Sequence, residues 1–210
     1  MLAFDHATFI TPDAAATAAA WRERHGIGTR RNGYLPHLGA RSWPVPLAPP
    51  SYLELLDVED EDVAASTPLG QRVLALRDAG GGPIAWCVRV ADLEAVARRL
   101  GLKVFQGATE AERGTLGWAS ASGPDHLPFF IAYGGDEDAR VGRWHEGYAL
   151  AGHESAPGEV TRINVAGSPE EYAEWLGPHD LPLRFVDGPP GLVAVAVATA
   201  RGEVEIAQPR

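Results

Sequence analysis

Two residues stand out for their chemistry because each lies in a strand-like stretch of alternating polarity. His6 occurs in LAFDHATFI, and Glu54 occurs in YLELL. An imidazole and a carboxylate are common ligands of divalent metals and common proton acceptors in catalysis. A carboxylate is costly to bury without a partner. Glu54 is therefore expected to act as a metal ligand, a general base or an anchor for a polar ligand atom, or else to face solvent or pair with an arginine.

The sequence offers three further candidates for a ligand-binding site, and these are Trp43, Cys87 and Phe130. Cys87 is the only cysteine, which excludes an internal disulfide and a thiolate zinc cluster, so a metal would have to use histidines and carboxylates. A buried cysteine usually behaves as a small hydrophobe, and a tryptophan in a strand usually belongs to the core. Structural roles therefore remain open for them.

Strand alternation gives each candidate a predicted face. It places Phe4, His6 and Thr8 on one face of the first strand, with Ala7 and Phe9 on the other. By the same alternation, Glu54 shares its face with residues 52 and 56, and Cys87 shares its face with residues 85 and 89. His6 is expected to be a metal ligand or a neutral hydrogen-bonding group in a pocket.

The elements that must position these residues repeat along the chain. Residues 2–26 are predicted to form a strand, a turn at Thr11-Pro12-Asp13 and an alanine-rich helix that ends at Gly26. Residues 83–101 repeat this plan, and residues 159–177 repeat it more weakly. Strand-like stretches follow each copy. The sequence therefore predicts an α+β fold built from βαβββ units.

These repeats predict three segments. Residues 1–135 are expected to form a paired βαβββ domain, residues 136–158 a linker, and residues 159–210 an additional C-terminal partial βαβββ module. In the third copy, Tyr172 and Trp175 are one helical turn apart and are expected to face a sheet.

Composition narrows the classes of function. The chain has 210 residues, a net charge of −10 and a single lysine, so it lacks the basic field that nucleic-acid binding requires. No apolar run is long enough to span a membrane, and the N-terminal stretch does not resemble an export signal. We therefore expect a cytoplasmic protein without nucleic-acid or membrane partners. Abundant arginine and alanine suggest a GC-rich bacterial genome.

The repeated unit resembles the vicinal oxygen chelate superfamily, which contains glyoxalase I and the extradiol dioxygenases. The resemblance rests on Asp5-His6 in the first strand and on Glu54 in the fourth. TPDAAATAAAWRERHG, SYLELLDV, AWCVRVADLE and LPFFIAY, in this order, are similar to bacterial glyoxalase-like domain proteins across about residues 2–134. The resemblance implies two modules whose sheets curl into a cup around a small-molecule site.

The resemblance also implies metal positions on the first and fourth strands of each module. His6 and Glu54 occupy two of these four positions, whereas Ala85 and Ala132 stand at the other two. A catalytic divalent ion usually has at least three protein ligands. We therefore expect no tightly bound, stoichiometric metal, although loop histidines could complete the set; these are His37, His126, His145 and His153. No cofactor is firmly implied, and a divalent metal remains open.

Three functions follow from the resemblance. The first is a glyoxalase-like protein that binds a small organic molecule in the cup, with a degenerate or absent metal site. The second is a metal-dependent lyase, isomerase or dioxygenase that uses His6 and Glu54, with Glu54 as the catalytic base. The third is a homodimeric scaffold whose cup is filled by side chains. Whether the protein is an enzyme stays open at this point.

Overall fold

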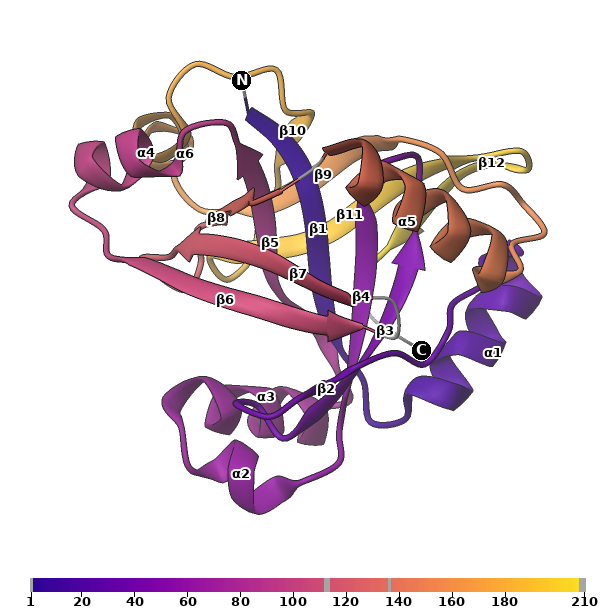
Figure 1. The fold of residues 1–210 in the computed structure, drawn as a ribbon. Coiled ribbons are helices and arrows are strands. Elements are labelled where there is room, and N and C mark those ends of the chain that lie inside the picture. Colours follow the sequence, from indigo (N-terminus) through magenta and orange to yellow (C-terminus); the bar gives the residue numbers. More distant parts are fainter. Residues whose placement is uncertain (1, 112–113, 136, 208–210) are drawn as a thin grey trace.

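The computed structural model describes residues 2–111, 114–135 and 137–207 (Figure 1). Its larger sheet has eight strands in the order β2-β3-β4-β1-β5-β8-β7-β6. The strands are β1 (Leu2–Ile10), β2 (Tyr34–Leu35), β3 (Ala40–Pro46), β4 (Tyr52–Val58), β5 (Gly82–Val90), β6 (Val104–Ala111), β7 (Gly114–Ala121) and β8 (Phe129–Tyr133).

The larger sheet contains two units with the same connectivity, which confirms the predicted βαβββ order. The first unit places α1 (Ala14–His25) after β1, and the second places α4 (Leu93–Leu100) after β5. In each unit the first strand pairs in parallel with the last, as β1 does with β4 and β5 with β8. The two units join where β1 runs antiparallel to β5. Helices α2 (Glu61–Ala65) and α3 (Pro68–Asp78) lie between the units in sequence.

The same local signals begin and end the two matching helices. The Asp13 carboxylate accepts a hydrogen bond from the Ala16 N–H, and Asp92 accepts one from the Ala95 N–H. These side chains satisfy backbone donors that the first helical turn leaves free. Gly26 and Gly101 end the helices with φ of 66° and 67°, a region that favours glycine. The turns read from the sequence therefore set the helix ends.

The C-terminal residues form a third βαβββ unit with a sheet of its own. The unit comprises β9 (Val160–Ala166), α6 (Pro169–Leu176), β10 (Leu183–Phe185), β11 (Gly191–Thr199) and β12 (Gly202–Ile206), and the sheet order is β10-β9-β11-β12. Tyr172 and Trp175 are both buried on one side of α6. Trp175 lies against Phe130 of β8, with ring centroids 5.7 Å apart, and Tyr172 lies against Phe185 of β10, with ring centroids 5.5 Å apart. Both residues therefore face strands, as predicted.

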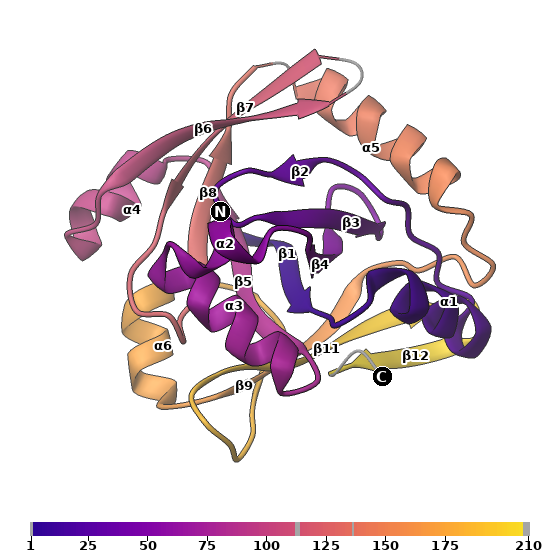
Figure 2. The same ribbon diagram turned by 90° about the horizontal axis from the view of Figure 1, so that it is seen from below.

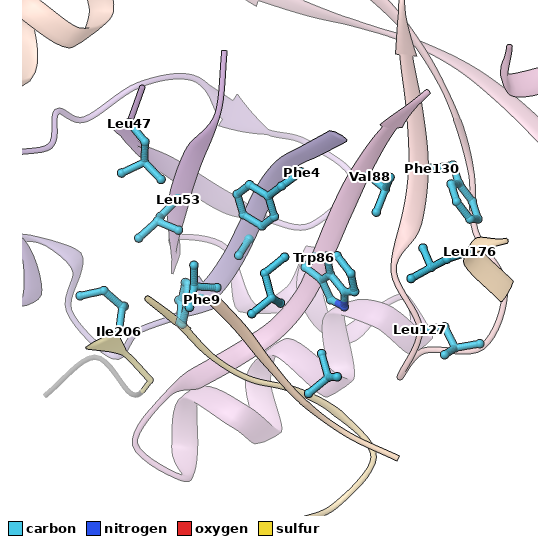
Figure 3. Packing of buried hydrophobic residues seen from close by; sticks show 14 of the residues in the cluster. Phe4, Phe9, Leu47, Leu53, Trp86, Val88, Leu127, Phe130, Leu176 and Ile206 are labelled. Carbon is cyan, nitrogen blue, oxygen red and sulfur yellow. The ribbon is translucent and has the colours of Figure 1, made fainter. Parts of the chain in front are cut away.

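One hydrophobic core joins the two sheets, because β11 packs against β5. Figure 3 shows side chains from both modules and from the C-terminal unit in this core, among them Phe9, Trp86, Phe130 and Ile206. A smaller cluster at one end of the large sheet includes Ile10 and Leu56, and α3 contributes Val73 to it. The large sheet therefore has one face committed to packing against the C-terminal unit.

The segment expected to be a linker contains a helix of fifteen residues, α5 (Glu137–Ala151). Its glycine, aspartate and histidine content is typical of a loop, but Trp144, Tyr148 and Ala151 recur at helical spacing. The Arg22 side chain donates hydrogen bonds to the carbonyls of Ala151 and Gly152, at 2.9 and 2.7 Å, and so holds the C-terminal end of this helix. Within the described residues, none of the helices combines the length and the apolar character needed to cross a membrane.

Candidate functional site

The large sheet curls, and its two faces have different roles. In Figure 2, its outer strands turn toward the same side, away from β9, β11 and β12. We call the side that packs against the C-terminal unit the core face and the opposite side the concave face. Alternate residues of the central strands point to the concave face, and these include His6, Thr8, Glu54, Cys87 and Arg89.

A β-bulge at Asp5 decides which residues of β1 reach the concave face. Phe4 pairs with Val88 and His6 pairs with Cys87, so Asp5 is an extra residue without a partner on β5. Simple alternation placed Phe4 and His6 on the same face, and this prediction was wrong: Phe4 belongs to the hydrophobic core together with Ala7 and Phe9. The bulge reverses the alternation, which brings the side chains of Asp5 and His6 together.

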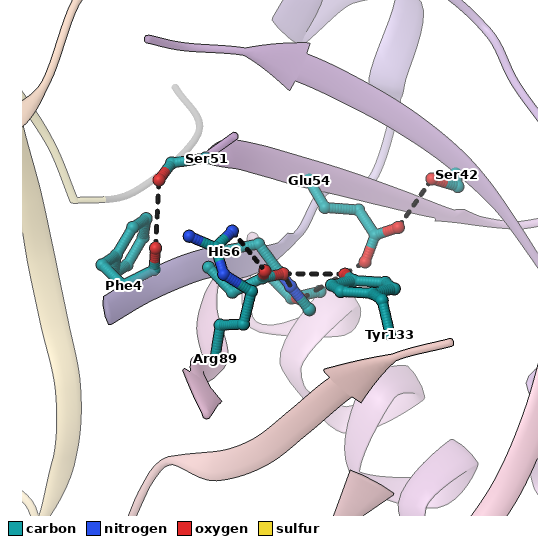
Figure 4. A network of polar contacts seen from close by, with 9 residues as sticks. Phe4, His6, Ser42, Ser51, Glu54, Arg89 and Tyr133 are labelled. Atoms are coloured by element: carbon teal, nitrogen blue, oxygen red, sulfur yellow. Dashed lines mark hydrogen bonds and ion pairs between the residues drawn. The ribbon is translucent and has the colours of Figure 1, made fainter. Parts of the chain in front are cut away.

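The Asp5 carboxylate is the centre of a buried polar network. Figure 4 shows three residues of this network, His6, Arg89 and Tyr133. Asp5 is fully buried, and its Oδ1 lies 2.7 Å from His6 Nδ1. The Tyr133 hydroxyl donates a hydrogen bond of 2.9 Å to the same oxygen. Arg89 Nη1 lies 3.6 Å from Asp5 Oδ2, which is an ion pair rather than a hydrogen bond. Sequence analysis noted Asp5 only as part of a motif and missed its role in the network.

Aromatic rings hold the His6 imidazole in place. The ring stacks on Tyr52 with centroids 4.6 Å apart, and it meets the edge of Phe129 at 5.4 Å. His6 is only 6% exposed. Because Nδ1 is engaged by Asp5, Nε2 is the nitrogen that remains for a ligand, a metal or a proton. The arrangement resembles the supported histidines of catalytic and metal sites.

Glu54 lies on the same face of the sheet as His6, beside its strand partner Thr8. The Ser42 hydroxyl donates a hydrogen bond of 2.6 Å to Glu54 Oε1, and the Thr8 hydroxyl donates one of 3.3 Å to Oε2. Two hydroxyl donors from neighbouring strands therefore hold the carboxylate, which is half-buried. They reduce the cost of burying a charge in an otherwise apolar strand.

Cys87 also reaches the concave face, beside its strand partner His6. Burial raises the pKa of the Cys87 thiol well above its usual range, and the Asp5 charge raises it further. Burial and the same charge raise the pKa of Tyr133, so its hydroxyl stays protonated and can donate to Asp5. A protonated, fully buried thiol is a poor nucleophile. The electrostatics therefore do not favour covalent catalysis by Cys87.

Two of the expected ligand-binding residues lie on the other face of the sheet. Phe130 is fully buried in the core against Trp175, and Trp43 packs against the same core from β3. Two of the loop histidines have partners elsewhere, since His126 pairs with Glu171 at 3.0 Å and His153 accepts a hydrogen bond from the Gly28 N–H. The structure therefore brings His6, Glu54 and Cys87 to one face and leaves Trp43 and Phe130 on the other.

Helix α5 covers part of the concave face, which the sequence did not indicate. The Trp144 ring lies 5.3 Å from the Tyr52 ring, and its indole N–H donates to the Leu47 carbonyl at 3.3 Å. Arg140 is buried, with its guanidinium 5.0 Å from the centre of the Tyr133 ring. Tyr52 and Tyr133 both neighbour the Asp5–His6 pair, so α5 restricts access to it.

Strand pairing tests whether the superfamily's four-ligand metal centre fits this chain. Across the antiparallel strands β1 and β5, His6 pairs with Cys87 and Thr8 pairs with Ala85. A two-fold rotation about the midpoint of these two pairs exchanges the modules. This rotation makes Ala85 the counterpart of His6 and Cys87 the counterpart of Thr8. Thr8 pairs with Glu54, whereas Cys87 pairs with Phe129. The counterpart of Glu54 is therefore Phe129 and not Ala132 as expected.

Ala132 packs against the core, on the other face of β8. Alanine and phenylalanine side chains offer no metal ligand, so only half of the four-ligand set is present on the concave face.

Comparisons with known proteins agree with this architecture. A family model described as a glyoxalase-like domain matches residues 4–181, which include both modules, α5, β9 and α6. The crystal structure of a hypothetical protein from Staphylococcus aureus matches with a TM-score of 0.66 at 17% identity, covering 94% of this chain and 81% of that chain. At this identity the likeness shows a shared fold alone.

Weaker likenesses involve two methylmalonyl-CoA epimerases. The enzyme from Streptomyces coelicolor, in complex with 2-nitronate-propionyl-CoA, matches with a TM-score of 0.46 at 21% identity, covering 62% of this chain and 94% of that chain. The enzyme from Mycobacterium tuberculosis matches with a TM-score of 0.46 at 17% identity, covering 65% and 89%. No curated protein matches the sequence. The family match and the paired βαβββ modules show that the chain belongs to the glyoxalase-like domain family, within the vicinal oxygen chelate superfamily.

Proposed function

We propose that this protein binds a small organic molecule on the concave face, without the complete four-ligand metal centre of its superfamily. The observation that carries this proposal is that His6 and Glu54 reach one face of the sheet, each already held by neighbouring side chains. The aromatic rings of Tyr52 and Phe129 contact His6. A few fixed polar groups among apolar surfaces are typical of small-molecule sites.

A second candidate is a metal-dependent enzyme that uses His6 and Glu54. It is favoured by the Asp5–His6 contact, because a carboxylate bound to one imidazole nitrogen fixes the ring and raises the basicity of the other. The same contact suits a general base that removes a proton from a bound substrate. The two candidates differ in whether binding requires a metal.

Thermal stability measured against a panel of compounds tests the proposal. The panel contains S-substituted glutathiones, 2-oxo acids and catechols, and a compound that binds the folded state raises the melting temperature. His6→Asn and Glu54→Gln should abolish the shift caused by any compound that binds. Glu205→Gln is the matched control, since this carboxylate lies on the C-terminal sheet and pairs with Arg162.

The outcomes separate the candidates. A shift that survives chelator treatment supports binding without a metal, whereas a shift that the chelator abolishes favours the metal-dependent enzyme. A shift that His6→Asn and Glu54→Gln leave unchanged would place the ligand elsewhere and overturn both.

A further inference from the structure

A second set of metal-ligating residues lies on the concave face, and it is not the superfamily set. Within residues 2–111, 114–135 and 137–207, Asp5, His6 and Cys87 form the one group whose potential ligand atoms all lie within 4.8 Å of one another. Asp5 is the bulge residue of β1, and Cys87 is the counterpart of Thr8 rather than of His6. Two of the three residues therefore stand outside the four superfamily positions.

One oxygen of the Asp5 carboxylate has no hydrogen bond, although the carboxylate has other partners. Asp5 is fully buried, yet its Oδ2 has no hydrogen-bond partner among the described residues. The nearby Arg89 Nη1 also lacks a hydrogen bond, and the 3.6 Å between the two atoms makes them an ion pair but is too long for a hydrogen bond. Leaving a buried charged oxygen without a hydrogen bond is costly, and a cation bound to it would remove that cost.

We propose that Asp5, His6 and Cys87 together bind one divalent ion of borderline softness, with Zn²⁺ as the representative. One sulfur, one nitrogen and one oxygen ligand are a donor set that suits zinc, with water in the fourth position. Zinc ligands lie at about 2.0–2.3 Å from the ion. His6 would therefore coordinate through Nδ1, so that the ion replaces the present contact of Nδ1 with Asp5 and the three side chains close around it. The inference does not depend on the proposed function, because the ion can bind without an organic ligand.

Cys87 is a protonated thiol before binding, and it releases its proton to water when its sulfur coordinates the ion. The Asp5 carboxylate and the resulting thiolate then neutralise both charges of the ion. The Arg89 cation beside Asp5 keeps its own charge, and because its side chain is 22% exposed, solvent screens it. The Tyr133 hydroxyl can keep its hydrogen bond to Asp5 and orient that ligand from outside.

This proposal departs from the expectation drawn from the sequence, which considered only histidines and carboxylates as ligands. The β1–β5 pairing alone places the thiol beside His6.

Cobalt titration tests the proposal with a readout that reports the thiolate itself. The purified protein is stripped with a chelator and titrated with Co²⁺, whose bond to a thiolate gives a charge-transfer absorption band in the near ultraviolet. We expect one Co²⁺ per chain with this band, and competition by Zn²⁺. Cys87→Ser should remove the band and weaken binding by roughly 100-fold, and Tyr133→Phe should weaken it by about 10-fold.

Glu54→Gln distinguishes the proposed ion site from the superfamily pair. The proposal expects Glu54→Gln, like the control Glu205→Gln, to keep the band. Absence of Co²⁺ binding, or binding that Glu54→Gln removes and Cys87→Ser preserves, would overturn it. Circular dichroism verifies that each variant is folded. If Cys87→Ser does not fold, Asp5→Asn provides a second variant that lacks one of the proposed ligands.

Discussion

At the scale of single residues, Asp5 has the most consequential position in the site. It is fully buried, and it contacts His6, Tyr133 and Arg89 at once. A buried charge with several partners is expensive to disturb, because removing it leaves those partners without the charge that they surround. Asp5 therefore both stabilises the fold and orients His6.

The stability of two variants measures this role. Asp5→Asn should lower the free energy of unfolding by about 2–4 kcal/mol, because it removes the charge but keeps the shape. Tyr133→Phe removes one hydrogen bond to the same oxygen and should cost about 1 kcal/mol. Urea denaturation of the single and double variants gives both values and their coupling. If the double variant loses the sum of what the two single variants lose, the two residues are not coupled. The carboxylate would then not act as the centre of the network.

His153 links the stability of the protein to pH. Burial, together with the nearby Arg22 cation, lowers its pKa from 6.5 to about 4. The Gly28 N–H donates a hydrogen bond to its Nδ1, which must therefore be unprotonated. The unfolded chain takes up this proton first, so stability falls as the pH decreases from about 6.5 toward 4.

Replacing His153 should remove part of this pH dependence. Between pH 7 and pH 5, His153→Gln should lose less unfolding free energy than the unchanged protein, since the amide oxygen can still accept from Gly28. Burial also lowers the pKa of His25, which acts in the same direction, so the difference between the two proteins is the relevant quantity. Identical pH profiles would contradict the role of His153.

At the scale of elements, α5 controls access to the concave face. The helix is tied down at its C-terminal end by Arg22, and it reaches the site through Trp144 and Arg140. Because Trp144 lies over Tyr52, which in turn stacks on His6, a change in the helix changes the exposure of the imidazole. The position of this helix thus affects access to His6, although its composition is typical of a linker.

Chemical modification of His6 measures that control. Trp144→Ala should raise the rate at which diethyl pyrocarbonate modifies His6, because truncation uncovers the ring that stacks on it. The rate is followed by mass spectrometry of the peptide that contains His6. Leu150→Ala is the control, since this side chain is 63% exposed on the outer side of the same helix. If both variants react alike, α5 does not protect the site.

At the scale of the whole molecule, the three βαβββ units share one core. Val195 and Val197 of β11 belong to the same cluster as Phe9 and Trp86 of the large sheet. Neither sheet can keep its apolar face covered without the other. The units are therefore expected to unfold together rather than as independent domains.

Denaturation followed by two probes tests this cooperativity. Tryptophan fluorescence and far-ultraviolet circular dichroism should report a single, coincident urea transition. Val195→Ala removes two methyl groups from the shared core and should lower the free energy of unfolding by about 2 kcal/mol, shifting both probes equally. A separate early transition in either probe would show that the C-terminal unit is an independent domain.

The sequence by itself determined the features that depend on neighbouring residues. Capping aspartates and terminal glycines set the ends of the matching helices α1 and α4, and the repeat of strand and helix predicted the α+β class and the two paired modules. The C-terminal residues follow the same element order, but their first strand pairs in parallel with the strand directly after the helix. Alternation within β4 correctly placed Glu54 opposite its apolar neighbours. These signals are local, because a helix cap or the alternation of a strand requires only a few consecutive residues.

Only the tertiary structure decided how these elements meet. The bulge at Asp5 depends on the pairing of β1 with β5, so alternation alone misplaced Phe4 and gave no sign of the Asp5 network. The same pairing brought Cys87 to His6, and the register of β8 turned Ala132 toward the core and Phe129 toward His6. Register and bulges arise from contacts between strands far apart in sequence. The strand pairing between the two modules therefore determines which residues make up the candidate site.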